Sequence, residues 1–239
     1  MRSVFPGFPP EAITFFRGIE RHNRREWFLP RKPVFEQHVK APMVQLVEAV
    51  NSALSRFAPT YATDPARAIY RFYRDTRFSK DKSPYKTHIA ASFRHRSLAC
   101  EGGGAGYYFH VSHKEVGIGG GMYMPMPETL RAVRGHLAKN HGEFRKLLAA
   151  RAIQKTFGDM QGDQLSRVPK GFAPDHPAAD LLRYKQFLWW IELPPETATS
   201  PELYAEIVTR FKAMAPVLEF LNAPLTGGKK GIDIRELLV

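Results

Sequence analysis

The sequence predicts an α+β fold in a single domain, with a mainly antiparallel sheet, helices packed on one face, and N-terminal and C-terminal helices flanking the sheet. Three observations support this prediction. Amphipathic helical patterns stand on both sides of a central stretch rich in strand formers. The strand patterns in that stretch follow one another through short connections, as antiparallel strands do. No internal repeat, low-complexity segment or interdomain linker divides the 239 residues, so we expect one domain over residues 1–239.

Two helices are predicted before the sheet. The first runs from Glu11 to Ile19, after the Pro9-Pro10 pair. The second runs from Pro33 to Leu54, and Pro42 predicts a kink or a restart within it, because proline lacks the N–H that a helix interior uses. Its apolar residues recur at helical spacing and predict a buried face: Val39, Met43, Leu46, Val47, Val50 and Leu54.

Four strands are predicted in the central stretch. The first follows an Asp64-Pro65 breaker, the third follows a glycine cluster at residues 102–104, and a short turn at residues 113–115 joins the third to the fourth. The predicted ranges are Ala68–Phe78, Thr87–Phe93, Gly106–Ser112 and Val116–Tyr123.

Helices dominate the remainder of the chain. Pro127 is placed as the first residue of a long helix, Asp175-His176-Pro177 opens a short one, and Phe187–Leu193 reads as a buried strand. Ser200-Pro201-Glu202 is a helix N-cap signal. The inward stripe expected after it is Leu203, Ile207, Phe211, Met214, Leu218 and Leu221.

Composition excludes several classes of protein. Cys100 is the only cysteine, so neither an intrachain disulfide nor a cysteine-based zinc site is expected, and the lone thiol fits a cytoplasmic location. The first ten residues lack the apolar core of a signal peptide, and no apolar run approaches the roughly 20 residues of a membrane span, so we expect no membrane partner. The net charge of +12 favours anionic partners, either small molecules or nucleic acid.

The positive charge is concentrated between Arg67 and Arg96, where nine Lys or Arg residues face two Asp residues. Because side chains alternate along a strand, Arg71, Asp75 and Arg77 should share a face with a tyrosine, while the other aromatic side chains point the opposite way. Arg74 falls among those aromatics, so we expect either a bulge or an internal ion pair for it.

Two interpretations of this face stay open. In the first, it is an ordinary ladder of Arg–Asp ion pairs on a solvated surface. In the second, Arg71 and Arg77 hold a planar phosphate or carboxylate group, and Asp75 orients one of them.

A loop follows at residues 79–86, predicted by its Ser, Asp and Pro content. Its lysines could form a positively charged edge above the face that carries Arg71 and Arg77, which we call the arginine face, or they could simply be solvated residues of a turn. Lys170, in a Pro-Lys-Gly turn with His176 nearby, could reach the same face. The predicted ligand-binding residues are therefore Arg71, Arg74, Asp75, Arg77, Lys80, Lys82, Tyr85, Lys86, His110 and Lys170.

The segment from Arg71 to Lys86 resembles the signature of a conserved hypothetical family, domain of unknown function 2461. Residues 23–28 (Asn-Arg-Arg-Glu-Trp-Phe), 106–110, 119–125 and 165–177 resemble its other motifs in order. The resemblance covers about residues 5–222, leaving a C-terminal tail at 223–239. His22 stands where the family often has a second asparagine. The resemblance implies a single domain and transfers no mechanism.

Other motifs carry weaker signals. The glycines around 102–106 and 117–121 lack the Gly-Lys-Ser/Thr of a phosphate loop, and are interpreted as a hairpin connection and a strand that bends or lets a ligand approach. Trp27 is interpreted as a core residue rather than a stacking platform. His88 and His110 could share a face if their strands pair, but no His-Glu-x-x-His motif is present, and no metal site is predicted.

Three functional hypotheses remain, and the sequence names no cofactor. The first is a module that binds a phosphate- or carboxylate-bearing small ligand through Arg71, Arg77 and Lys86. The second is an enzyme acting on such a ligand, in which Asp75 or His110 moves a proton. The third is a module that binds nucleic acid or an acidic protein, for which binding should depend steeply on salt.

Overall fold

A four-stranded antiparallel sheet in the order β1-β2-β3-β4 lies at the centre of the computed structural model, which describes residues 4–98 and 103–227. The register pairs His88 with Ser112, His110 with Gly117, and Gly119 with Trp190. The strands are β1 (His88–Arg94), β2 (Gly106–Ser112), β3 (Val116–Met122) and β4 (Phe187–Leu193).

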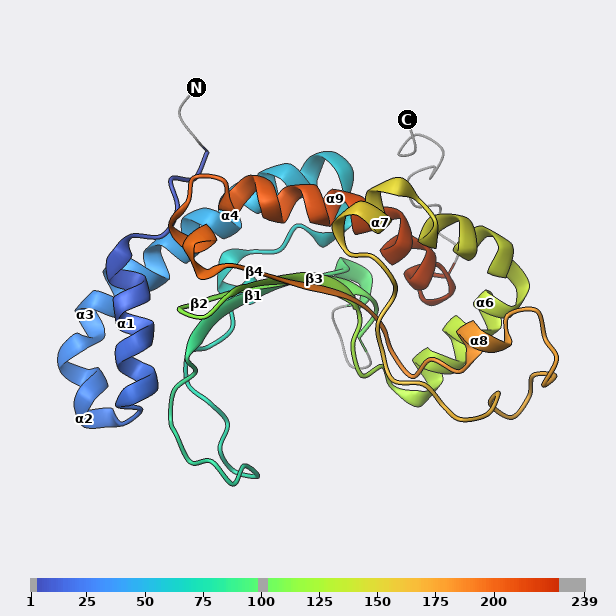
Figure 1. Cartoon of the computed structure of the whole chain (residues 1–239), viewed down its shortest axis with the longest axis horizontal. Helices are drawn as coiled ribbons and strands as arrows, with labels where there is room; N and C mark the ends of the chain where they lie inside the picture. Colours follow the sequence, from blue (N-terminus) through green and yellow to red (C-terminus); the bar gives the residue numbers. More distant parts are fainter. Residues whose placement is uncertain (1–3, 99–102, 228–239) are drawn as a thin grey trace.

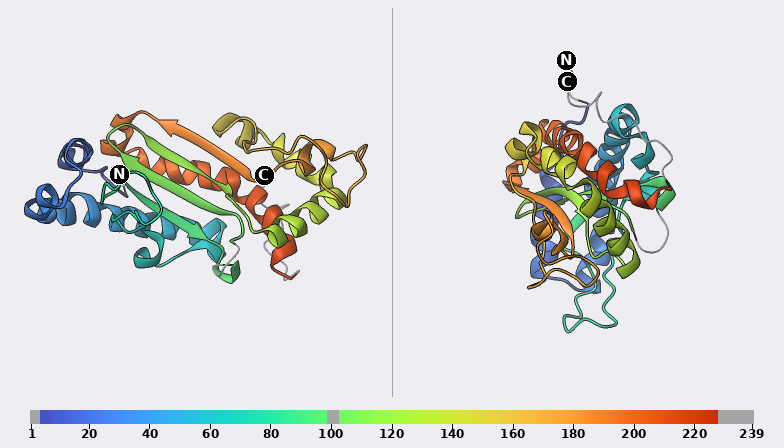
Figure 2. Two further views of the ribbon diagram at one scale, coloured as in Figure 1. Left: turned by 90° about the horizontal axis from the view of Figure 1, so that it is seen from below. Right: turned by 90° about the vertical axis from the view of Figure 1, so that its right-hand side faces the viewer.

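Alternation along these strands separates two faces of the sheet. One face contributes mostly buried side chains, including Phe93, Phe109, Ile118 and Trp189, with Ile191 and Leu193 of β4 partly buried. Helices α4 (Ala41–Phe57) and α9 (Leu203–Asn222) cover this face and contact each other. Figure 2 shows the opposite face of the sheet from below: the strands lie in front of α4 and α9, and no helix of the described residues crosses them. We call this opposite face the open face.

The N-terminal helices form one end of the molecule (Figure 1). The kink or restart predicted near Pro42 takes the form of a turn of π-helix directly before α4, and Pro42 sits in the first turn of α4, as expected. The six residues of the predicted buried face are all fully buried. The elements are α1 (Pro10–Arg21), α2 (Arg25–Phe28), η1 (Leu29–Arg31), α3 (Lys32–Val34), η2 (Phe35–Lys40), η3 (Pro59–Tyr61) and α5 (Pro65–Ala68).

Helices from the second half form the opposite end. Pro127 begins α6 as predicted, and Ser200 accepts a hydrogen bond from the Glu202 N–H at 3.1 Å just before α9. The predicted inward stripe of α9 is fully buried. The elements at this end are α6 (Pro127–Leu148), α7 (Arg151–Thr156), α8 (Ala179–Leu182) and η6 (Ala223–Leu225). The turn η5 (Pro195–Thr199) follows β4 at the other end, where the Ala198 carbonyl accepts the Phe8 N–H at 2.8 Å, and η4 (Arg96–Leu98) follows β1.

The predicted strand at Ala68–Phe78 is wrong. Ala68 ends α5, which Asp64 caps by accepting the Ala66 N–H at 2.8 Å. The chain then touches β1 only briefly, where Ile69 bridges Ala91, and leaves the sheet as an extended hairpin. We call residues 69–87 the arm.

Pairing within the arm explains why no continuous strand forms. The Lys86 N–H donates to the Phe72 carbonyl and the Arg74 N–H to the Pro84 carbonyl, both at 2.9 Å. Pro84 has no N–H to return a bond, so the ladder stops after the single bridge between Tyr73 and Tyr85. The strand formers thus serve an extended segment that pairs mainly with itself.

The remaining strand and helix predictions are confirmed within one or two residues at most ends, which is the ordinary variation of element boundaries. Phe187–Leu193 forms a strand as predicted, but the expected burial is wrong: β4 lies at the edge of the sheet, and only Phe187 and Trp189 in it are buried. The α+β class, the antiparallel sheet and the flanking helices are as predicted, in one compact domain. Cys100 and the part of the predicted tail beyond residue 227 lie outside the described residues. Within residues 4–98 and 103–227, no helix has the length and apolar character required to cross a membrane.

Candidate functional site

An ion pair joins the two sides of the arm. Arg74 pairs with Asp81 across the hairpin and also donates to the Ser83 carbonyl at 3.3 Å. Ser83 donates to Asp81 through both its hydroxyl and its N–H, and these bonds, together with Arg74, lower the Asp81 pKa to about 2. Of the two alternatives for Arg74, the internal pair is therefore correct, and its role here is to fold the arm.

Asn23 attaches the arm to the N-terminal helices. Its side-chain amide donates to the Tyr85 carbonyl at 2.9 Å and accepts the Tyr85 N–H at 3.0 Å. The Tyr85 ring is buried against Phe28 at 4.3 Å between ring centroids. Tyr85, a predicted ligand-binding residue, thus presents its ring to the core and its backbone to Asn23.

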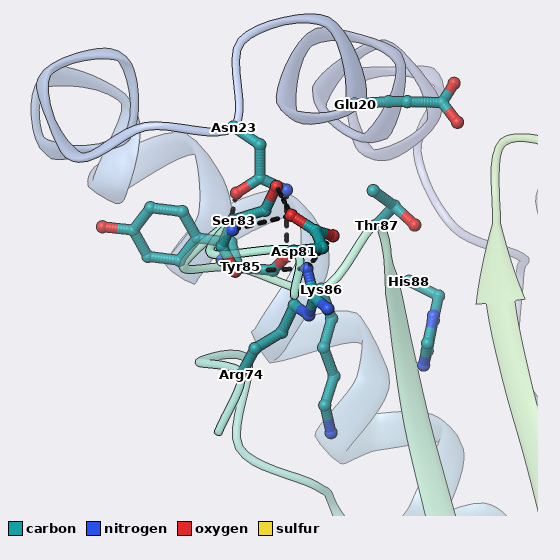
Figure 3. A pocket seen from close by; sticks show the side chains of 9 residues that line it. All are labelled: Glu20, Asn23, Arg74, Asp81, Ser83, Tyr85, Lys86, Thr87 and His88. Atoms are coloured by element: carbon teal, nitrogen blue, oxygen red, sulfur yellow. Dashed lines mark hydrogen bonds and ion pairs between the residues drawn. The ribbon is translucent and has the colours of Figure 1, made fainter. Parts of the chain in front are cut away.

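A cavity of about 360 Å³ lies where the arm, the end of α1 and the start of β1 meet. Figure 3 shows Asn23, Ser83, Asp81 and Arg74 gathered on one side of it and Glu20 on the other. Two cationic and two anionic side chains line the cavity, so its charges balance. Its lining residues are Glu20, Asn23, Arg74, Asp81, Ser83, Tyr85, Lys86, Thr87 and His88.

The predicted arginine face forms a local ion-pair cluster. Asp75 accepts from the Arg77 Nε at 3.1 Å and Nη2 at 2.8 Å, and lies 3.7 Å from the Arg71 guanidinium. The Arg77 hydrogen bonds hold the pKa of Asp75 below its usual value. All three residues are exposed. This geometry matches the ion-pair interpretation, and it also has Asp75 orienting Arg77, as the anion-binding interpretation requires.

The aromatic face predicted opposite these residues forms only in part. Phe72 is buried in the core, but Phe78 is 95% exposed at the tip of the arm. The reason is that the arm leaves the sheet, so its outer half has no core to pack against.

Lys86 differs from the other arm cations. It is partly buried, and its ammonium lies 4.9 Å from the centre of the Tyr70 ring. Burial lowers the Lys86 pKa, and the Arg71 charge acts in the same direction. Within the part of the chain that the structure describes, Lys86 forms no ion pair with a carboxylate.

A second cationic side chain, Arg94, lies near Tyr70, as Lys86 does. Burial acts to raise the Tyr70 pKa, but hydrogen bonds with Ser92 and Arg94 and the charges of Arg94 and Lys86 outweigh it, so the net pKa is lowered. Arg94 is exposed and, among the described residues, also has no carboxylate partner. Lys86, Arg94 and Tyr70 therefore form a positive corner between the base of the arm and the open face.

His110 is positioned by a carboxylate on the open face. Its Nε2 lies 3.1 Å from Glu115, and its Nδ1 lies 3.5 Å from the Tyr108 hydroxyl. The His88 ring lies 5.0 Å away between ring centroids, which confirms that the two histidines share a face. Burial, with the His110 and Lys86 charges, lowers the His88 pKa to about 4, so this ring is neutral near pH 7.

The other predicted site residues lie apart. Lys80 is exposed near the tip of the arm, and Lys82 donates to the Thr76 carbonyl at 3.0 Å. The segment between α7 and α8, which contains Lys170, lies at the α6 end of the molecule, whereas the arm lies at the α1 end (Figures 1 and 2). The structure therefore does not bring Lys170 to the arginine face. In residues 4–98 and 103–227, no group of three His, Cys, Asp or Glu side chains could hold a metal ion.

Sequence reasoning missed three features of this region. Asn23 was part of a recognised motif, but its partner stands 62 positions away. The sequence places Trp190 and Tyr108 in strands and gives them no role at the site. One signal points to Trp190: the glycines of β3, which predict a strand that bends or lets a ligand approach, provide the room that its indole occupies. Trp27 packs against the core, as predicted.

Comparison with known proteins adds a family and no activity. The family model described as conserved hypothetical protein (DUF2461) matches residues 11–220. No curated protein and no solved structure matches the chain significantly.

Proposed function

The chain belongs to the conserved hypothetical protein family DUF2461, a membership that names no reaction, and we propose that the protein binds a small ligand bearing a phosphate or carboxylate group at the base of the arm. The positive corner formed by Lys86, Arg94 and Tyr70 is the proposed anion site, with Arg71 adding charge beside it. A cytoplasmic location is part of the same proposal.

One observation carries the proposal. Lys86 is a partly buried cation whose pKa is lowered by burial, and in the described residues no carboxylate neutralises it. Burying an ammonium group costs free energy unless an anion compensates it. A bound phosphate or carboxylate would supply that compensation. The same argument does not apply to Arg77, because its side chain is exposed and its guanidinium already donates to Asp75.

A thermal-shift panel of phosphorylated and carboxylated metabolites tests the proposal at low and high salt. A ligand at about 100 times its Kd should add about 2.7 kcal/mol, which raises the Tm by roughly 5–11 °C. Lys86→Met, which removes the charge and keeps an apolar stem, should abolish this rise. Lys80→Met, which changes an exposed lysine on the same arm, should retain it.

The result that would refute the proposal is an equal rise in both variants, or no rise with any anion. A salt-sensitive rise with oligonucleotides alone would favour the nucleic-acid alternative instead, because several phosphate contacts release several counterions.

A second candidate function is an enzyme acting on the same anionic ligand. The observation that favours it is the His110–Glu115 pair, because a carboxylate that orients an imidazole is a recurring arrangement for proton transfer. His110→Gln should then abolish turnover of the bound compound in an activity assay, while calorimetry still detects binding of that compound.

A further inference from the structure

Trp190 lies flat against the glycine strand β3 on the open face. A Cβ built at Gly117 would overlap the indole and would lie 2.6 Å from the His110 ring, and one built at Gly119 would lie 2.8 Å from the indole Cε3. The absence of side chains at these two positions lets the ring rest on the backbone. One π-face of Trp190 is therefore packed on the sheet and the other points away from it.

Four more rings continue from Trp190 across the open face. His110 lies 5.4 Å and Tyr108 lies 5.9 Å from Trp190 between ring centroids, His88 lies 5.0 Å from His110, and Tyr70 lies 6.1 Å from Tyr108. We call these five residues the aromatic row. None is fully buried, and no helix from the described part of the chain covers this side of the sheet (Figure 2). The row thus presents a partly exposed aromatic surface.

Charge is distributed unevenly along the row. Lys86 and Arg94 stand at the Tyr70 end without carboxylate partners in the described residues. At the other end, Glu192 accepts the Trp190 Nε1–H at 3.2 Å, and Glu115 pairs with His110. Both carboxylates are therefore engaged by ring nitrogens of the row itself. An occupant that complements this surface is planar and aromatic at one end and anionic at the other.

We propose that the aromatic row and the positive corner together bind a free nucleoside phosphate, with the nucleobase on Trp190 and Tyr108 and the phosphate at Lys86. Bases stack on aromatic side chains irrespective of their identity, because every base has a π-face. The proposal rests on the proposed anion site and names the class of ligand that the site takes.

Calorimetry with three probes distinguishes binding of a nucleoside phosphate from binding of any small anion at the positive corner. Adenosine 5′-monophosphate carries both base and phosphate, ribose 5-phosphate carries only the phosphate, and adenosine carries only the base. Stacking on an aromatic side chain should make the nucleotide bind roughly 5- to 150-fold more tightly than ribose 5-phosphate. Trp190→Leu should remove this advantage, and Trp190→Phe should retain part of it.

Two further variants keep the test independent of folding defects. Gly117→Ala keeps the tryptophan but displaces its ring, so it should weaken nucleotide binding while ribose 5-phosphate binding stays unchanged. Phe78→Ala removes an exposed aromatic of the arm that lies outside the row, so it should leave all affinities unchanged. Circular dichroism and the Tm establish that each variant is folded before titration.

The outcomes are distinct. If ribose 5-phosphate and the nucleotide bind equally, and Lys86→Met abolishes both, the anion site stands and the nucleotide inference falls. If no probe binds, both fall. If a single-stranded oligonucleotide binds and mononucleotides do not, the occupant is nucleic acid and the commitment to a free nucleotide is wrong.

Discussion

Removing the Asn23 side-chain amide should release the arm from the body of the protein. Asn23→Ala deletes the donor to the Tyr85 carbonyl and the acceptor of the Tyr85 N–H. An intramolecular hydrogen bond contributes about 0.5–1.5 kcal/mol net. The two bonds together predict a loss of about 1–3 kcal/mol, and a loss of about 2 kcal/mol lowers the Tm by roughly 4–8 °C.

Asn51 provides a matched control, because its side chain makes the same pair of bonds. It donates to the Thr63 carbonyl at 2.7 Å and accepts the Thr63 N–H at 3.0 Å, but it holds the loop after α4 and not the arm. Asn51→Ala should therefore cost a similar amount of stability. Urea unfolding measures both losses.

Hydrogen exchange then distinguishes the two variants. In Asn23→Ala, the amides of Arg74 and Lys86 should exchange faster than in the wild type, because they depend on pairing within the arm. In Asn51→Ala they should not change beyond the global loss of stability. The reasoning is refuted if Asn23→Ala costs less than about 0.5 kcal/mol and leaves arm exchange unchanged, since Asn23 would then hold nothing.

Three further predictions concern pH and the core. The pKa of His88 is about 4 in the folded protein, against an ordinary value of 6.5, so between these pH values the unfolded chain binds a proton that the folded chain does not. The wild type should therefore lose stability as the pH falls from 6.5 toward 4. In His88→Gln this loss, measured by urea unfolding at pH 6.5 and pH 4, should be smaller by on the order of 3 kcal/mol. Asn222→Ala should lower the free energy of unfolding by at least about 2–3 kcal/mol in urea, because it leaves the buried Ala105 N–H and C=O without hydrogen-bond partners. A loss below about 1 kcal/mol would contradict this. Gly117→Ala should cost about 1–3 kcal/mol and change tryptophan emission by moving Trp190, and unchanged emission would show that the ring does not rest on this strand.

Local patterns predicted the regular elements well, because they depend on spacing within one segment. The stripe of α9 is buried as its spacing indicates, and the turn at residues 113–115 joins two strands as expected. Pro42 and Pro127 lie in the first turns of their helices for a reason that each carries alone, the missing N–H.

The candidate site was predicted less completely. Arg74 is among the predicted ligand-binding residues, and the internal ion pair that the sequence also allows for it is formed with Asp81, a partner that the pattern does not name. The first hypothesis names Lys86 beside Arg71 and Arg77, but the sequence gives no physical reason why Lys86 should differ from Lys80, since the two lysines differ only by their surroundings. Burial and the absence of a carboxylate partner depend on residues from other elements, so no pattern within the segment could reveal them.

What the sequence alone determined is the α+β class, the order of most elements and the concentration of positive charge between residues 67 and 96, because propensity, periodicity and charge are local properties. Only the tertiary structure decided that residues 69–87 form an arm instead of a strand, since a strand needs a partner edge and this segment pairs mainly with its own return. It also decided that Asn23 clamps Tyr85 and that Trp190 lies on the glycines of β3. Both contacts join residues distant in the chain, and the same residue types in another packing would not meet.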